Sequence, residues 1–143
     1  MNIKSLLIAS IIFIAFSPQA KEKSFGNATV LEVTSIYDGD TFRANIEGFP
    51  AVIGEHMSIR INGIDTPELR GKCDKEKQLA RLAKQFTVER LRAAKSITLK
   101  NIKRGKYFRL IADVYVDGVN LGGLLIKGKH ALRYKGKTKQ TWC

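Results

Sequence analysis

Three stretches in the first half of the chain have the β-branched or alternating character of β-strands, and turn residues separate them. These stretches are 28–36, 41–46 and 57–64. In the third stretch, Ile59 and Ile61 fall on one face. Arg60 and Asn62 fall on the other, because successive side chains of a strand point to opposite faces. The segment 47–56 contains two Gly and one Pro and is predicted to be a loop.

The second half of the chain opens with a helical pattern. Apolar residues recur at close to helical spacing over 75–95, and Asp74 is suited to cap the start of this helix. These apolar residues are Leu79, Leu82, Ala83, Phe86 and Leu91. Two strands are predicted next, over 96–102 and 107–118, followed by a short helix over 120–127. The apolar face of the second of these strands carries Phe108, Leu110, Ala112, Val114 and Val116.

This order of elements predicts an α+β domain that is mainly β. Three consecutive strands and a later pair suit a small, curved antiparallel sheet with a helix packed against one end. Closing such a sheet into a five-stranded barrel removes its exposed edges. We therefore expect one domain built around a small β-barrel.

Residues 1–20 are predicted to be a secretory signal peptide. Lys4 precedes an apolar run over 5–16, and Ala20 supplies a small residue before a cleavage site. The run is shorter than the roughly 20 residues of a membrane span, and its N-terminal position argues against the alternative of a buried core helix. The folded domain is therefore expected over 21–143. We expect it to be exported to the periplasm or the medium, without stable membrane association.

The net charge of +12 favours a polyanionic partner, either nucleic acid or an anionic membrane surface. Eight Lys or Arg and no acidic residue lie over 90–112. The aromatic residues in or beside the basic stretches are Tyr107, Phe108, Tyr134 and Trp142. Basic side chains interleaved with aromatic rings suit a single-stranded nucleic acid. The alternative is a solvated basic face, with Phe108 in the core.

Four acidic residues stand out in this basic chain: Asp38, Asp40, Asp65 and Glu68. The first two flank Gly39 in "YDGDTF", a strong hairpin signal because glycine readily adopts a positive φ. If the strands are neighbours, three of the carboxylates converge, and hard oxygen ligands suit Ca²⁺ or Mg²⁺. The alternative role of each acid is a turn or a helix cap.

Two arginines interrupt the apolar alternation of predicted strands. Arg60 and Arg109 each lie on the face opposite the apolar row. If both point toward the acidic residues, they form a phosphate clamp, because a guanidinium binds phosphate oxygens in pairs and stays charged. The alternative is a pair of ordinary exposed strand residues.

The two cysteines, Cys73 and Cys143, are an even number, which in an exported protein suggests one disulfide. Closing a loop of about 70 residues stabilises the folded state by roughly 4 kcal/mol in the chain-entropy model. Two free thiols are the alternative. Neither cysteine has the sequence setting of a nucleophile or a zinc ligand.

Three motifs together resemble the staphylococcal-type nucleases, the thermonuclease family. They are "DGDT" (38–41), "IRINGIDTPE" (59–68) and "KYFRLIADVYVDG" (106–118), and the resemblance covers about 28–135. It implies a five-stranded OB-fold barrel with one long and one short helix packed on it. It also implies Ca²⁺-dependent hydrolysis of phosphodiesters in DNA and RNA, which favours single strands and leaves 3′-phosphates.

The resemblance also implies roles for individual residues. The implied ligands of Ca²⁺ are Asp40, Asp65 and the main-chain carbonyl of Thr66. Glu68 matches the residue that activates or orients the attacking water, and Arg60 and Arg109 match the pair that grips the phosphate. The residues that align with the nucleotide pocket are Lys106, Tyr107 and Tyr134.

The sequence also departs from the best-known members of that family. The loop after "DTPE" is short, and no long C-terminal helix follows Tyr134. We hypothesise that a disulfide between Cys73 and Cys143 compensates by tying the tail to the active-site loop. The alternative function is a non-catalytic nucleic-acid-binding OB-fold module. A basic membrane-active protein fits less well because it leaves the acidic residues unexplained. A monomer is the expected state.

Overall fold

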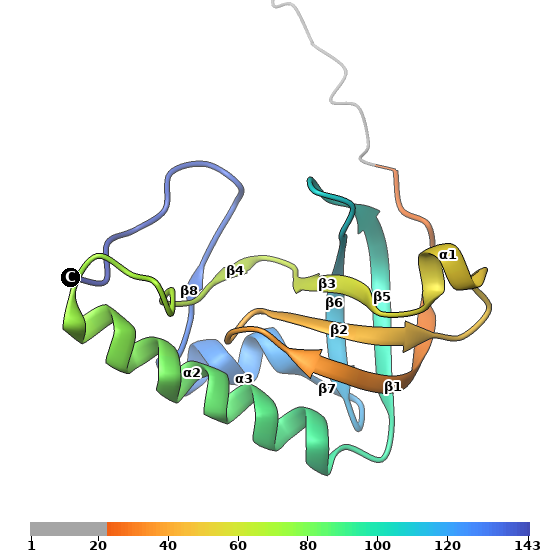
Figure 1. The fold of residues 1–143 in the computed structure, drawn as a ribbon, viewed down its shortest axis with the longest axis horizontal. Coiled ribbons are helices and arrows are strands. Elements are labelled where there is room, and N and C mark those ends of the chain that lie inside the picture. The colour runs from red at the N-terminus through yellow and green to blue at the C-terminus, as the bar shows by residue number, and fades with distance from the viewer. Residues whose placement is uncertain (1–22) are drawn as a thin grey trace, which may run out of the picture.

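The computed structural model describes residues 23–143, so the predicted signal peptide at 1–20 lies outside the described residues. Five strands form a closed barrel (Figure 1). They are β1 (Ala28–Ile36), β2 (Thr41–Ile46), β3 (Met57–Ile61), β5 (Ile97–Arg104) and β6 (Leu110–Val116), in the order β3-β2-β1-β5-β6. Neighbours in this order pair antiparallel, and β3 closes the barrel by pairing in parallel with β6. The prediction of a mainly β, α+β domain with an OB-fold barrel is confirmed.

Three helices and three short strands complete the domain. They are α1 (Ala51–Gly54), β4 (Ile64–Asp65), α2 (Asp74–Ala93), β7 (Val119–Asn120), α3 (Leu121–Lys127) and β8 (Leu132–Arg133). The predicted long and short helices are α2 and α3, whereas α1 is a single turn within the predicted loop 47–56, closed by Glu55 N donating to Ala51 O at 3.0 Å. No helix within 23–143 is long and apolar enough to cross a membrane.

The third predicted strand, 57–64, is interrupted. β3 ends at Ile61, and a turn with Gly63 at a φ of 75° separates it from β4. Glycine adopts this left-handed conformation readily because it has no Cβ. After the turn, the backbone N of Thr66 donates to Asp40 Oδ2 at 3.3 Å. The bend therefore brings the "DTPE" segment next to the first acidic turn.

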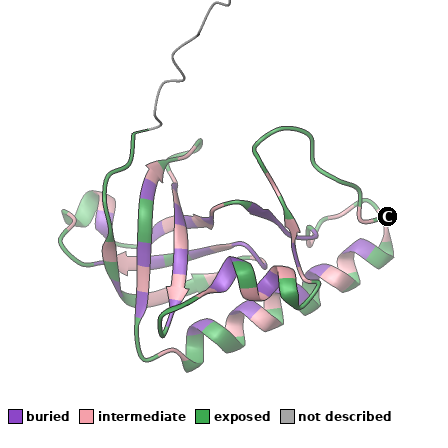
Figure 2. Cartoon of the chain, turned by 180° about the vertical axis from the view of Figure 1, so that it is seen from behind, coloured by how far each residue is buried: buried purple, intermediate pink, exposed green. Residues whose placement is uncertain are grey.

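The alternating pattern predicts the core side of β6 well, with one error. Buried and partly buried residues alternate along β6 (Figure 2). Leu110, Ala112, Val114 and Val116 are buried, whereas Phe108 is 55% exposed. β6 begins only at Leu110, and Phe108 lies in the preceding hairpin turn with a φ of 52°. The two-residue alternation holds only within a strand. The prediction that Phe108 belongs to the core is therefore wrong.

The helix α2 packs on the barrel through small residues. Its buried positions are Glu76, Ala80, Ala83, Thr87 and Leu91, whereas Leu82 is 52% exposed. Alanine and threonine let the helix backbone approach closely, and Thr87 Oγ1 donates to Gly39 O at 2.7 Å. The N-cap is Cys73 and not Asp74, which lies in the first turn. The hydrogen bond from Thr87 to Gly39 holds α2 directly against the turn that carries Asp40.

Candidate active site

The turn between β1 and β2 presents Asp40. Tyr37 N donates to Thr41 O at 2.9 Å across the turn, and Asp40 N donates to Asp38 Oδ1 at 3.1 Å. The sequence predicts that Gly39 is needed for a positive φ in the turn, but its φ is not positive, so this explanation is wrong. A Cβ on Gly39 would lie 2.9 Å from both Ala83 Cβ and Thr66 Cγ2. Packing against α2 therefore requires a glycine here.

We predict that Gly39→Ala destabilises the domain by about 1 to 3 kcal/mol, because Ala83 Cβ cannot rotate away from an added methyl group. The free energy of unfolding would be measured by urea titration. The control is Gly123→Ala in α3, where the nearest atom to an added Cβ is 3.5 Å away. This control should be neutral or slightly stabilising. Equal urea midpoints for the two variants would contradict the packing argument.

Asp40, Asp65 and Arg60 form a buried ion cluster. Arg60 Nη1 lies 3.0 Å from Asp40 Oδ1, and Arg60 Nη2 lies 3.2 Å from Asp65 Oδ1. The side chains are 2% exposed for Asp40, 7% for Asp65 and 14% for Arg60. Thr41 Oγ1 donates to Asp40 Oδ1 at 2.8 Å. Buried carboxylates must be paired or bound to a cation, and one guanidinium here pairs with both.

The carboxylate pair has the donor chemistry of a Ca²⁺ or Mg²⁺ site. Asp40 and Asp65 are both buried, both offer oxygen, and lie close enough to share one guanidinium. Glu68 does not join them in a cluster of three. Within 23–143, the only cluster of at least three Cys, His, Asp or Glu groups with metal-ligand spacing is Cys73, Glu76 and Cys143. Its two cysteines are joined in a disulfide and offer no thiolate. The three carboxylates therefore do not form one ligand group, and the pair of Asp40 and Asp65 is the candidate for holding a cation.

A cavity of about 380 Å³ lies beside the ion cluster. Its walls include Arg60, Glu68, Arg109, Tyr134 and Lys139. The β3–β6 pairing brings the two arginines to this cavity, because Arg60 lies opposite Ile111, two residues after Arg109. The buried Nε of Arg109 has no hydrogen-bond acceptor within the described part of the chain. Arg109 lines the cavity, so its charged guanidinium group is placed to bind an anion there.

The predicted nucleic-acid-binding residues lie in two places. Tyr134 lines the cavity. Lys106 and Tyr107 lie instead at the turn between β5 and β6, where Tyr107 is 89% exposed. Phe108 is next to them and lies under the guanidinium of Arg104, 4.7 Å from its Cζ. The turn therefore presents two exposed rings beside basic residues.

Glu76 is a positioning residue that the sequence interpretation missed. This buried side chain accepts hydrogen bonds from Glu68 N at 3.3 Å and from Lys72 N at 3.0 Å, so it fixes the loop that carries Glu68. Glu76 is the third residue after the N-cap Cys73, the position where glutamate often reaches back to free backbone N–H groups. This capping pattern was the signal available in the sequence.

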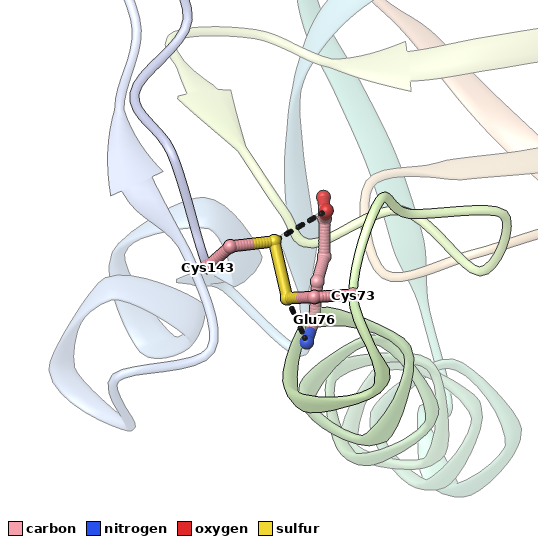
Figure 3. A group of neighbouring side chains, drawn as sticks. All are labelled: Cys73, Glu76 and Cys143. Atoms are coloured by element: carbon pink, nitrogen blue, oxygen red, sulfur yellow. Dashed lines mark hydrogen bonds between the residues drawn. A yellow bond between two sulfur atoms is a disulfide. The ribbon is translucent and has the colours of Figure 1, made fainter.

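A disulfide between Cys73 and Cys143 joins the start of α2 to the C-terminal tail, with a Cα–Cα distance of 6.0 Å (Figure 3). The predicted pairing is confirmed. We define the tail as residues 134–143. It brings Lys139 to the cavity, where Lys139 Nζ lies 2.6 Å from Glu68 Oε1 and 3.1 Å from Asp65 Oδ1. No local pattern in the sequence marked Lys139 as a site residue.

These contacts change the titration of three groups. Burial raises the pKa of Asp38 from 3.8 to about 6, and the neighbouring Asp40 carboxylate adds to the rise. The hydrogen bond from Lys139 lowers the pKa of Glu68, which favours its ionised form. Burial opposes the charged form of Lys139, but the hydrogen bonds to Glu68 and Asp65 outweigh it and raise the pKa of Lys139.

Comparison with known protein families gives a match. The model of the family described as staphylococcal nuclease homologue matches residues 58–141, more than half of the chain. None of the curated proteins matches significantly. The matched region runs from β3 to the tail and includes Arg60, Asp65, Glu68 and Arg109.

Proposed function

The chain belongs to the staphylococcal nuclease family, whose members are generally nucleases, and from this we propose that it is a Ca²⁺-dependent phosphodiester hydrolase acting on DNA and RNA. The observation that carries the proposal is the cavity, because Arg60, Arg109 and Glu68 line it together beside the buried carboxylates Asp40 and Asp65. We further propose that single strands are favoured, that the sugar is not discriminated and that 3′-phosphates are left.

The mechanism follows from the charges at this cavity. A phosphodiester is an anion that repels nucleophiles, so preorganised positive charge is the main requirement for its hydrolysis. Arg109 binds the phosphate oxygens together with Arg60, which lines the same cavity, and offsets the charge of the transition state. Glu68, a carboxylate in the cavity wall, orients the attacking water and takes its proton. As the new P–O bond forms, the P–O5′ bond breaks and the 5′ oxygen leaves with a proton from solvent.

The metal requirement concerns Asp40 and Asp65. These carboxylates, with the main-chain carbonyl of Thr66, would hold Ca²⁺, which when bound supplies further positive charge beside the phosphate. Arg60 contacts both carboxylates and so keeps them in position before any cation arrives.

The turn between β5 and β6 supports the proposed preference for single strands. The bases of a single strand are free to stack, and stacking on an aromatic ring is worth roughly 1 to 3 kcal/mol per base. Tyr107, exposed beside Lys106, offers such a ring close in sequence to Arg109. Tyr134 offers a second ring in the cavity wall.

We also propose that the domain acts after export, in the periplasm or the medium, as a monomer without stable membrane association. Residues 1–20 have the sequence pattern of a secretory signal. The disulfide supports this location because disulfides persist mainly in oxidising compartments.

The test is the release of acid-soluble nucleotides from heat-denatured DNA and from RNA, with millimolar Ca²⁺ or with excess EGTA. We expect release only with Ca²⁺. Glu68→Gln should lower the rate by roughly 10²- to 10⁴-fold, the usual contribution of a general base. The control Glu55→Gln removes an exposed carboxylate outside the cavity and should leave the rate unchanged.

Two results would contradict the proposal. A Glu68→Gln variant with the wild-type rate would remove Glu68 from the mechanism. Wild-type protein that binds DNA in a salt-sensitive way but releases no nucleotides would favour a non-catalytic nucleic-acid-binding module.

A further inference from the structure

The tail contributes Tyr134 and Lys139 to the wall of the candidate active site and is fixed at both ends. At its start, Tyr134 N donates to Gly63 O at 2.9 Å, next to the β4–β8 pair. At its end, Cys143 is bonded to Cys73 at the start of α2 (Figures 1 and 3). Between these points the tail carries Lys139 to the cavity. Its course is therefore set by covalent and backbone contacts at both ends.

Lys139 contacts two of the three acidic groups on which the proposed reaction depends, Asp65 and Glu68. Its Nζ lies 3.1 Å from Asp65 Oδ1, the oxygen that also accepts from Arg60, and 2.6 Å from Glu68 Oε1. A carboxylate held by an ammonium is less available to a metal ion. In the same way, a Glu68 that accepts from Lys139 is less available to a water molecule.

The charge balance indicates whether Arg60 or Lys139 is displaced when a divalent ion binds. Arg60 and a divalent ion together balance the three carboxylates of Asp40, Asp65 and Glu68, which leaves the charge of Lys139 in excess. The side chain of Lys139 is 44% exposed, whereas that of Arg60 is only 14% exposed. A half-exposed ammonium is held weakly because water screens it. Lys139 is therefore the cation that a metal ion displaces.

We propose that Lys139 holds the tail closed over the active site by occupying the carboxylates that a divalent cation needs, so that cation binding and tail opening are coupled. The inference rests on the proposed function for the identity of the cation. Because only three residues separate Lys139 from the disulfide, the displaced ammonium stays near the site and returns when the cation leaves. The tail is thus an internal competitor of the metal ion.

The test compares Lys139→Met with Lys137→Met in the full domain with its disulfide intact. Lys137 is exposed in the same tail, so its replacement removes the same charge without touching Asp65 or Glu68. Calcium chloride is titrated alone, without nucleic acid, by calorimetry at fixed ionic strength. We expect Lys139→Met to bind Ca²⁺ roughly three- to tenfold more tightly than Lys137→Met, as for the loss of a partly screened charged contact.

A second measurement needs no metal. Trp142 is the one tryptophan in the sequence and lies in the tail, three residues after Lys139. In excess EGTA, acrylamide should quench its fluorescence more strongly in Lys139→Met than in Lys137→Met, because the tail is no longer held closed. Equal quenching in the two variants would overturn the proposal.

The two measurements separate the two hypotheses. Equal or weaker Ca²⁺ affinity of Lys139→Met relative to Lys137→Met would also overturn the coupling, while leaving the nuclease proposal intact. If none of the proteins binds Ca²⁺, the calcium dependence of the proposed function fails. The quenching comparison then decides alone whether Lys139 holds the tail closed.

Discussion

Replacing Arg109 with methionine is expected to lower the rate of DNA cleavage by roughly 10³- to 10⁵-fold, the range found for an arginine that stabilises the transition state of phosphoryl transfer. Arg109 lines the cavity, and its buried Nε has no acceptor within 23–143. Because this Nε makes no hydrogen bond within the described residues that could be lost, we expect methionine at this position to leave the stability of the fold nearly unchanged. The rate would be measured on heat-denatured DNA with saturating Ca²⁺, and the melting temperature would be measured in parallel.

Two further variants test whether the loss of activity is specific to the guanidinium group of Arg109. Arg109→Lys keeps the charge but loses the paired donors of a guanidinium, so we expect it to remain far below the wild-type rate. Arg92→Met removes an exposed arginine at the end of α2, outside the cavity, and should change the rate by less than about threefold. A rate for Arg109→Met close to that of Arg92→Met would show that Arg109 does not contact the reacting phosphate.

Arg60→Met is expected to lower the free energy of unfolding by about 3 to 5 kcal/mol in EGTA, because it leaves the buried carboxylates Asp40 and Asp65 without their shared guanidinium. For a domain of this size the melting temperature should fall by on the order of 10 to 20 °C. Both quantities would be measured by thermal and urea unfolding with the disulfide intact.

The control for this variant is Arg43→Met, which removes an exposed arginine from the middle of the neighbouring strand β2. It should shift the unfolding free energy by no more than about 0.5 kcal/mol. Adding Asp40→Asn to Arg60→Met should recover part of the lost stability, because one unpaired charge is then gone. Equal unfolding midpoints for Arg60→Met and Arg43→Met would contradict a structural role for the ion cluster.

Much of the fold is predictable because its signals are local. The alternation over 110–116 predicts four buried residues correctly, and the spacing over 75–95 predicts α2 within two residues of its ends. Errors arise where regular structure stops. By its position in the alternation, Phe108 would belong to the buried face of the strand, but it lies in a turn. In α2 the buried face is made mainly of small residues, and Leu82 lies outside it.

The candidate site is only partly predictable for the same reason. Arg60 and Arg109 stand out because each breaks an apolar pattern, and the structure brings both to one cavity. Lys139 gives no such signal, because one lysine in a basic tail resembles its neighbours. Its contact with Asp65 depends on where a disulfide between distant residues directs the chain. The hydrophobic periodicity of the sequence carries no information about contacts between residues this far apart in the chain.

The parallel pairing of β3 with β6 has a consequence for folding kinetics. It joins residues 59–61 to residues 110–112, so it closes a long loop, and contacts of this kind form slowly because of their entropic cost. The hairpins β1–β2 and β5–β6 are local and can form earlier. A chain with only these hairpins contains Arg60 and Arg109 but does not hold them together. The recovery of activity during refolding should therefore follow barrel closure, and lag behind the appearance of β-structure.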